Sequence, residues 1–379
     1  MAQADYVIVG SGLTGATIAR ALVDHGCDVA VVERRSYPGG NVADFRHACG
    51  VMIQRHGPHY FRTSSARVWD YVNRFATFFP FEAVVKTRID GRLENWPIAA
   101  SYLRRTVGES WRPAFAGEPR NFEEAALSMM PRTVYEKFVK PYTEKQWGAA
   151  ANSLSADLCR RFDVRADDDP RLTPGARHQG VPIGGYSLMM ERMLEGIPLA
   201  LDCDFLGARD RFRARRLTVF TGPIDLYFDG IFGRLGYRAQ CRETEYLKDQ
   251  DWVQPCVQVN ETSPDVSHLR TIEWKHLLPE EQARRIRGTV LTRETPFTPT
   301  DADQFEYPFP DRSNKQAYLR YRELADRQRG VWFCGRLGEY RYYDMDQVIG
   351  RSLMLAERIL QTHEAVFPAG VNGASNDSD

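Results

Sequence analysis

A glycine-rich turn between an apolar strand and a helix, close to the start of this 379-residue chain, constrains its fold most strongly. The turn has the pattern Gly-x-Gly-x-x-Gly at Gly10, Gly12 and Gly15, and it follows an apolar run over 6–9 that predicts a buried parallel strand. The first glycine permits a tight turn, the second lets backbone approach a pyrophosphate, and the third lets the helix pack closely on the strand. We therefore predict a Rossmann-like unit in which a helix over 14–25 points its N-terminus at phosphates.

A second apolar strand ends at Glu33, about 20 residues after the glycines, where a carboxylate can accept the ribose hydroxyls of a dinucleotide. The pair Gly39-Gly40 follows soon after, between Arg34 and Asn41, and lets the backbone approach the cofactor again. This arrangement resembles the glutathione-reductase-like flavoproteins, so FAD is favoured over NAD. No second Gly-x-Gly-x-x-Gly occurs later, so we predict no separate nicotinamide domain. The alternative is a strand–helix turn without a ligand.

Charge and cysteine content exclude several other classes of protein. The 50 basic and 50 acidic side chains balance, so no global field attracts nucleic acid or an anionic membrane. Seven scattered cysteines, without Cys-x-x-Cys or a zinc-type Cys/His spacing, predict reduced thiols in a cytoplasmic protein and no metal site. The early strand leaves no room for a signal peptide, and no apolar run approaches 18 residues, so we expect no membrane span.

The later segments predict an α/β fold whose dinucleotide domain is discontinuous. Strands over 217–222 and 330–336 read as the return of the chain to this domain, and the Asp-, Pro- and Gly-rich stretch over 166–178 is either a mobile lid or a long connection. We expect a Rossmann-like FAD-binding domain with an inserted helical domain and an antiparallel β-sheet domain. Within them we predict helices capped by Ser64 or Ser65 and by Asn121, a helix over 131–139 that begins with proline, and a strand over 253–259. The expected bounds are 1–75, 200–235 and 330–365 for the FAD-binding domain, 76–98 and 236–329 for the β-sheet substrate domain, 99–199 for the helical domain with its lid, and 366–379 for a disordered tail.

Two short runs, over 138–148 and 335–349, are dense with side chains that could bind a ligand or catalyse a reaction. Phe138 and Tyr142 are four residues apart and would share a helix face, as an ordinary core pair also would. The motifs Tyr-Thr-Glu-Lys-Gln-Trp-Gly, Thr-Gly-Pro-Ile-Asp-x-Tyr-Phe-Asp and Tyr-Tyr-Asp-Met-Asp-Gln-Val-Ile, which begin at 142, 221 and 342, resemble the bacterial type of UDP-galactopyranose mutase. The resemblance extends over about residues 5–360.

The resemblance implies an FAD-dependent isomerase that interconverts the pyranose and furanose forms of a nucleotide sugar such as UDP-galactopyranose. N5 of the reduced flavin attacks the anomeric carbon in this family, without net redox change. The resemblance further implies a nucleoside-diphosphate sugar as substrate, NAD(P)H or a reductase as electron donor, and a homodimer as one assembly. Neither a nucleic acid nor a membrane is implied as a partner.

The resemblance also assigns residues to roles. Arg161 and Arg270 match the two pyrophosphate arginines, and His59 matches a histidine beside the isoalloxazine; these are the catalytic candidates. Phe138 and Tyr142 match the residues that hold the uracil ring. The substrate-binding candidates are Phe138, Tyr142, Trp147, Tyr307, Tyr342, Tyr343 and Asp344, and the cofactor-binding candidates are Gly10, Gly12, Thr14, Gly15, Glu33, Arg34, Gly40, Asn41, Arg336 and Met345.

Several positions depart from the family pattern around the sugar and the lid. Arg62 replaces a second histidine, Pro141 replaces a glycine, His268 replaces a tyrosine, and the stretch over 169–173 has no tyrosine. Trp96 stands where the family has leucine in Asn-Leu-Pro-Phe-Asn. These departures keep open a different substrate, such as another UDP-hexose, a UDP-N-acetyl-hexosamine or a TDP-6-deoxyhexose. A flavin amine oxidase-like oxidoreductase fits the glycine motif but not the other motifs, and the two arginines argue against a non-catalytic binder.

Overall fold

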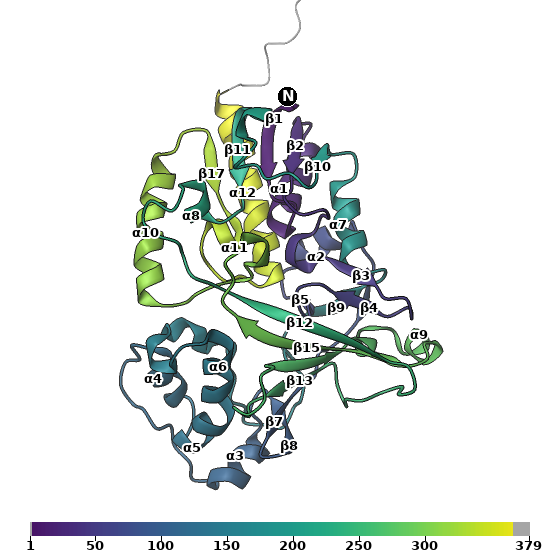
Figure 1. The fold of residues 1–379 in the computed structure, drawn as a ribbon, viewed down its shortest axis with the longest axis vertical. Helices are drawn as coiled ribbons and strands as arrows, with labels where there is room; N and C mark the ends of the chain where they lie inside the picture. Colours follow the sequence, from purple (N-terminus) through teal and green to yellow (C-terminus); the bar gives the residue numbers. More distant parts are fainter. Residues whose placement is uncertain (1, 367–379) are drawn as a thin grey trace, which may run out of the picture.

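A parallel sheet of five strands, formed by N-terminal, central and C-terminal segments, carries the glycine-rich turn (Figure 1). The structure is a computed structural model that describes residues 2–366. The strand order is β10–β2–β1–β11–β17, and every pair is parallel. The predicted α/β class and the return of the chain to this sheet are confirmed. The strands are β1 (Ala2–Val9), β2 (Val29–Val32), β10 (Leu199–Ala200), β11 (Phe212–Phe220) and β17 (Val331–Phe333).

Helices from distant parts of the chain pack on this sheet. In Figure 1, α1 and α12 lie side by side, the first purple and the second yellow, and they pack against each other. Apolar side chains such as Ile8, Ile18 and Ile349 are fully buried between helices and sheet. Ser65 caps α2 by accepting a hydrogen bond from the Val68 amide at 3.3 Å. The helices are α1 (Leu13–Asp24), α2 (Ala66–Asn73), α7 (Tyr186–Leu194), α8 (Ile224–Tyr227), α10 (Arg312–Arg327), α11 (Gly335–Gly338) and α12 (Met345–Val366).

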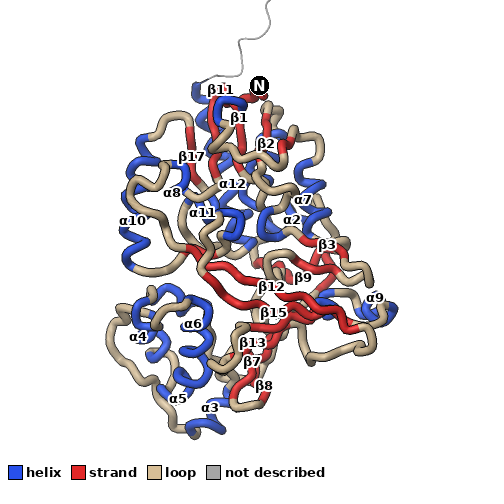
Figure 2. Tube along the Cα trace, in the orientation of Figure 1, coloured by secondary structure: helices blue, strands red, loops and turns tan. Residues whose placement is uncertain are grey.

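A second sheet of seven strands crosses the middle of the molecule, where strands gather in Figure 2. Its order is β16–β12–β15–β14–β13–β7–β8, and it is mixed rather than antiparallel throughout, because β13 and β7 run parallel. Its strands are β7 (Val85–Ile89), β8 (Arg92–Trp96), β12 (Tyr237–Leu247), β13 (Gln258–Glu261), β14 (Arg270–Glu273), β15 (Thr289–Phe297) and β16 (Tyr307–Pro308).

The strand expected over 253–259 is wrong in its first part. The amides of Val253 and Gln254 donate to the Glu273 carboxylate at 3.1 and 2.7 Å, so they have no place in a ladder of strands. β13 therefore begins only at Gln258.

A helical unit lies beside the second sheet (Figure 2). The helix expected from Pro131 is interrupted, because α5 gives way to a π-helical turn over Tyr135–Val139 before α6. Pro141 has no N–H to donate to the preceding turn, and a π-helical turn is one way to relieve such a break. Asn121 caps α4 as predicted, with the Glu124 amide donating at 3.0 Å. The helices are α3 (Ala100–Val107), α4 (Phe122–Leu127), α5 (Arg132–Val134) and α6 (Lys140–Trp147).

Two small sheets and an irregular segment connect these units. Hydrogen bonds hold the segment over 166–178 to its neighbours. The Leu172 amide donates to the Ala83 carbonyl at 2.8 Å, and the Arg165 side chain donates to the Asp169 carbonyl at 2.9 Å. Of the expected tail over 366–379, Val366 is the last residue of α12, and the remainder lies outside the described residues. Within residues 2–366 no helix is long and apolar enough to cross a membrane, and no group of three His, Cys, Asp or Glu side chains could hold a metal ion. The remaining elements are β3 (Asp44–Arg46), β4 (Met52–Gln54), β5 (Phe61–Thr63), β6 (Phe78–Pro80), β9 (His178–Pro182) and α9 (Glu280–Arg285).

Candidate active site

The glycine-rich turn forms a backbone cradle at the carboxyl ends of β1, β2 and β11. Gly10 has φ +99°, and a Cβ built on it would lie 2.2 Å from Oγ1 of Thr221. A Cβ on Gly15 would lie 1.9 Å from the Gly10 carbonyl oxygen, so α1 can approach β1 only if this residue is glycine. The carboxyl edge of a parallel sheet beside a helix N-terminus is where such folds bind dinucleotides.

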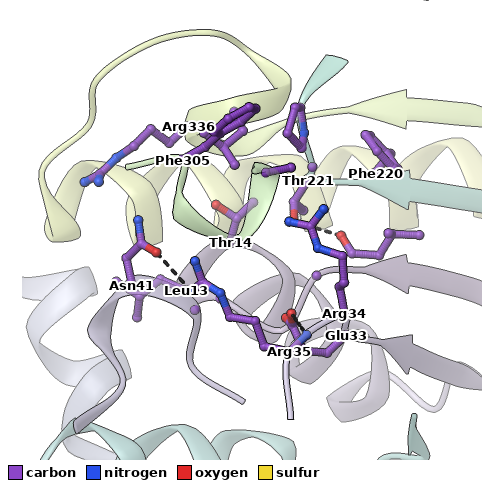
Figure 3. A pocket seen from close by; sticks show the side chains of 18 of the residues that line it. Leu13, Thr14, Glu33, Arg34, Arg35, Asn41, Phe220, Thr221, Phe305 and Arg336 are labelled. Carbon is purple, nitrogen blue, oxygen red and sulfur yellow. Dashed lines mark hydrogen bonds between the residues drawn. The ribbon is translucent and has the colours of Figure 1, made fainter. Parts of the chain in front are cut away.

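A cavity of about 210 Å³ opens at this cradle (Figure 3). Glu33 is buried at its edge, where its carboxylate accepts from the amide and hydroxyl of Ser11, both at 2.8 Å, and from the Arg35 amide at 2.9 Å. Oε2 receives both bonds from Ser11, whereas Oε1 receives only the bond from the Arg35 amide and keeps a lone pair for a ribose hydroxyl. Gly15 packs beneath the turn rather than lining the cavity. The other cofactor candidates all line it: Gly10, Gly12, Thr14, Glu33, Arg34, Gly40, Asn41, Arg336 and Met345.

A second cavity, of about 440 Å³, adjoins the first. Asn41, His59, Arg336 and Met345 line both cavities, so a group that fills the first would be exposed to a ligand in the second at this junction. Its walls come from α11 and α12 beside the parallel sheet, from α4 and α6 of the helical unit, and from strands of the seven-stranded sheet. Of the catalytic and substrate candidates, those that line the second cavity are His59, Tyr142, Trp147, Arg161, Arg270, Tyr307, Tyr342, Tyr343 and Asp344.

Arg270 is held by a row of charges across three neighbouring strands. Glu294 on β15 lies directly opposite Arg242 on β12 and Arg270 on β14. Its fully buried carboxylate accepts from the Nε atom of both arginines, at 2.8 Å for Arg242. Burial alone would lower the pKa of Arg270, but the Glu294 carboxylate outweighs it and the net pKa stands well above its usual value. Arg270 is therefore a permanent cation in the cavity wall.

The charge row continues to the loop that carries His59. Glu306 accepts from Arg242 Nη1 at 2.6 Å and lies 3.3 Å from His56 Nδ1. Burial raises the pKa of Glu306, but the bond to His56 and the charge of Arg242 lower it below its usual value overall. Gly57, with φ +90°, lets the loop approach this row, since a Cβ there would lie 2.9 Å from Glu294 Oε1 and 3.1 Å from Arg270 Nη2.

His59 is uncharged at neutral pH. Burial, reinforced by the charge of Arg336, lowers its pKa to about 3. Its Nδ1 atom is buried and has no hydrogen-bond partner among the described residues. The backbone carbonyl of His59 accepts a bond from the Tyr186 hydroxyl at 3.0 Å, which fixes the loop at the junction of the two cavities.

Arg161 reaches the cavity from the end of a 3₁₀ turn over Ala156–Arg161 and rests on an aromatic ring. Its guanidinium lies 4.4 Å from the centroid of Tyr342, and that of Arg336 lies 5.0 Å from the same ring. The ring centroid of Tyr307 lies 6.2 Å from that of Tyr342, with 21° between the ring planes. No carboxylate within residues 2–366 forms an ion pair with Arg161, so its charge is available to an anionic ligand.

Asp344 joins the tyrosine pair to the position that departs from the family. Its Oδ1 accepts from the Tyr342 hydroxyl at 3.2 Å, and its Oδ2 accepts from Arg62 at 3.0 Å. Tyr343 uses its backbone carbonyl to accept from Arg336 at 3.0 Å. Arg62, which stands where the family pattern has a histidine, is thus a cation tied to the site.

Phe138, which was expected to hold the uracil ring, does not line this cavity. Its side chain is completely buried and lies behind Trp96, with ring centroids 5.6 Å apart. Trp96 lines the cavity, as do Tyr142 and Phe162. Trp147 also lines it but is mostly buried, with its ring edge-on to Phe309 at 5.9 Å.

Four residues of the charge row were missing from the expected site: His56, Arg242, Glu294 and Glu306. Their alignment depends on strand register and on a loop 186 residues before Arg242, neither of which the local pattern of the sequence specifies. Arg62 and Trp96 were visible in the sequence as departures, but only the structure gives them a place in the wall.

Comparisons with known proteins agree with this arrangement. Residues 137–342 match the family model described as UDP-galactopyranose mutase, and residues 8–75 match an NAD(P)-binding Rossmann-like domain. The chain is 32% identical to the "Probable UDP-galactopyranose mutase" of Klebsiella pneumoniae, with 96% of each chain covered. It is 29% identical to the dTDP-fucopyranose mutase of Escherichia coli, with 94% of this chain and 99% of the relative covered. A crystal structure of a reduced UDP-galactopyranose mutase superposes with a TM-score of 0.73 over 98% of this chain and 97% of that one, at 14% identity.

Proposed function

Because this chain belongs to the UDP-galactopyranose mutase family, we propose that it is an FAD-dependent isomerase that interconverts the pyranose and furanose forms of a nucleoside-diphosphate sugar. One observation carries the proposal. The two arginines, Arg161 and Arg270, line a single cavity that meets the dinucleotide cavity at His59 and Arg336. A sugar attached to a diphosphate between these arginines would present its anomeric carbon to the junction.

FAD fits the first cavity on its own geometry. The backbone cradle at Gly10 and Gly12 suits a pyrophosphate, and the buried carboxylate of Glu33 suits a ribose. When bound in its reduced form, FAD supplies the nucleophile for the anomeric carbon. We assign Thr14, Arg34, Gly40, Asn41, Arg336 and Met345 to the same cofactor.

The protein's own contribution is to orient the substrate and to stabilise the leaving diphosphate. Arg270, fixed at Nε by Glu294, and Arg161, resting on Tyr342, would donate charge-assisted bonds to the phosphate oxygens as negative charge develops on them. Neutral His59 would leave the junction without a competing acid at physiological pH. Tyr307, Tyr342, Tyr343 and Asp344 would line the path between diphosphate and sugar, with Trp147 in the wall.

The same chemistry on a different nucleotide sugar is the second candidate. The ion pair between Arg62 and Asp344 lies in the cavity wall, and one relative of similar identity is a dTDP-fucopyranose mutase. An arginine in place of a histidine changes the polar groups that a sugar meets there. A UDP-N-acetyl-hexosamine, another UDP-hexose or a TDP-6-deoxyhexose would each be consistent with this change.

We further propose that NAD(P)H or a separate reductase reduces the flavin and that the enzyme acts in the cytoplasm, where the unpaired state of all seven cysteines would persist. A homodimer is the proposed assembly by analogy with the family.

Turnover of a panel of nucleotide sugars by dithionite-reduced, FAD-loaded enzyme tests the function. Conversion of UDP-galactofuranose to the pyranose, resolved by chromatography, is the expected result. Turnover of only another member of the panel would favour the second candidate, and no turnover of any member by enzyme with bound reduced FAD would refute both.

A further inference from the structure

We propose that the pyrimidine ring of the substrate stacks on Trp96, which has taken over this role from Phe138. The inference rests on the proposed function, because it assigns one end of the same cavity. It concerns a residue of this chain that departs from its family's pattern.

The order of side chains along the cavity identifies its aromatic end. Arg161 and Arg270 provide the two cations, and Phe162 follows Arg161 directly in the sequence. The charges of both arginines act on the hydroxyl of Tyr142, which lines the cavity next to them. In a nucleoside diphosphate only a ribose separates the phosphates from the base. A base attached to a diphosphate at these arginines would therefore reach Tyr142 and Phe162.

Trp96 is the centre of the aromatic rings at this end. Its ring centroid lies 5.2 Å from that of Tyr142 and 5.1 Å from that of Phe162, at angles of 47° and 60°. Both neighbours therefore meet the indole at an inclination rather than lying flat upon it. The indole is half-buried and lines the cavity, so part of its surface is open to a ligand.

Phe138 supports the indole from behind. The two rings lie 5.6 Å apart with only 30° between their planes, and Tyr102 contacts Phe138 edge-on at 5.4 Å from the other direction. Phe138 has no exposed surface, so a base cannot touch it without displacing Trp96. The indole is larger than the leucine that the family pattern has here, which is why it can cover Phe138.

The backbone keeps Trp96 in this place. It is the last residue of β8 and pairs with Val85 of β7, which also lines the cavity. The next residue is Pro97, and a residue before proline favours extended backbone. A rigid ring on an ordered strand offers a stacking surface at low entropic cost, and every base has a π-face that can use it.

Isothermal titration of the oxidised, FAD-loaded enzyme with UDP, with TDP and with inorganic pyrophosphate tests the proposal. We expect Trp96→Leu to weaken the binding of UDP or TDP about tenfold, since stacking of one base on an aromatic side chain has about this value or more. Pyrophosphate has no base, so its affinity should change less than twofold. With the preferred nucleotide sugar, Trp96→Leu should raise KM and leave kcat within about twofold, as for a uniform binding interaction.

Two variants keep the test decisive. Trp96→Phe retains a ring and should bind the nucleotides within about threefold of wild type, even where the leucine variant folds poorly. Phe138→Leu removes a ring of the same cluster that has no exposed surface; it should lower Tm and leave nucleotide affinity within about twofold. Unchanged or tighter UDP binding in Trp96→Leu, an equal loss for pyrophosphate, or a larger loss in Phe138→Leu would each overturn the assignment.

The outcomes separate this inference from the function on which it rests. Wild-type turnover of a nucleotide sugar together with unchanged KM in Trp96→Leu would reject the role of Trp96 alone. Wild-type enzyme that binds pyrophosphate but neither nucleoside diphosphate would reject the proposed function as well.

Discussion

Arg270 and Glu294 lie directly opposite each other on β14 and β15, and the buried carboxylate accepts a hydrogen bond from Nε of the arginine. Because the bond uses Nε, the remainder of the guanidinium is available to a ligand in the cavity that Arg270 lines. The same carboxylate binds Arg242, so one anion lies between two cations that are mostly removed from water. We therefore expect both the stability of the fold and catalysis to depend on Glu294.

We predict that Glu294→Gln loses both stability and activity. The substitution keeps the shape but leaves the nearly buried Arg270 without its anion and Arg242 with Glu306 alone, and breaking a buried pair in this way typically costs about 3–5 kcal/mol. The urea midpoint of the FAD-loaded enzyme and kcat/KM with the preferred nucleotide sugar should both fall. Glu245→Gln is the control, because its pair with Arg293 joins the same two strands β12 and β15 but is about half exposed, and such pairs contribute less than about 1 kcal/mol. Equal effects of the two substitutions would refute a special role of Glu294 in stability and activity.

The two arginines that we propose to bind the diphosphate should be dispensable for cofactor binding. Arg161→Ala and Arg270→Ala should each lower kcat/KM by more than about 100-fold, because the leaving diphosphate loses a charged donor in a sheltered cavity. The flavin absorbance of the purified protein should be unchanged, since Arg161 and Arg270 do not line the first cavity. Arg132→Ala is the control for Arg161, because Arg132 lies in the same helical unit, has a side chain that is 56% exposed and lines neither cavity. A loss as large in Arg132→Ala would point to general electrostatics instead.

Gly57→Ala should reduce activity as well as stability, because its effect is not limited to backbone strain. Alanine at a positive φ costs about 1–2 kcal/mol, and here the methyl group would also press on Glu294 and Arg270. We expect a lower Tm and a kcat/KM reduced by more than about tenfold. Gly91→Ala is matched to it, with φ +79° and no atom within 4 Å of its Cβ, so it should lower Tm and leave kcat/KM unchanged. Full activity in Gly57→Ala would show that the loop can move away without cost.

Stability should fall in acid through His59. Its pKa is about 3 in the folded protein and about 6.5 in the unfolded chain, so between these values the unfolded state binds the additional proton. This contribution is complete above pH 6.5 and is lost as the pH falls towards 3, with a slope that approaches about 1.4 kcal/mol per pH unit. Denaturation in urea at pH 7 and pH 5 should therefore show a smaller loss in His59→Gln than in wild type. His25 is exposed, so His25→Gln should lose as much stability between pH 7 and pH 5 as wild type. The same loss in His59→Gln would contradict the assignment.

Local patterns predicted the parts of the fold that depend on local chemistry. Gly10, Gly12 and Gly15 between an apolar strand and a helix can form little else than the observed turn, so α1 and β2 were predicted nearly in full and β1 in its second half. The side-chain caps at Ser65 and Asn121 were predicted for the same reason. The two arginines, expected only from family resemblance, do meet in one cavity.

The remainder of the site depends on contacts between distant segments. The i,i+4 spacing of Phe138 and Tyr142 predicted a shared face, but Pro141 interrupts the helix and Trp96, 42 residues earlier, covers one of the two rings. The alignment of Arg242, Glu294 and Arg270 follows from the register of three strands, and a shift by one residue would turn each side chain to the other face. Such relations are properties of the assembled sheet and not of any single stretch.

The interleaved parallel sheet also sets an order of events during synthesis. β1 has β2 from its own neighbourhood, but β11 arrives about 200 residues later, β17 after residue 330, and α12, which packs on α1, last of all. Until then the cradle at Gly10 lacks the wall that Arg336 and Met345 provide. A ribosome-bound chain therefore has to keep its first strands soluble while the helical unit and the seven-stranded sheet emerge, and FAD can be captured only when nearly the whole chain has left the exit tunnel.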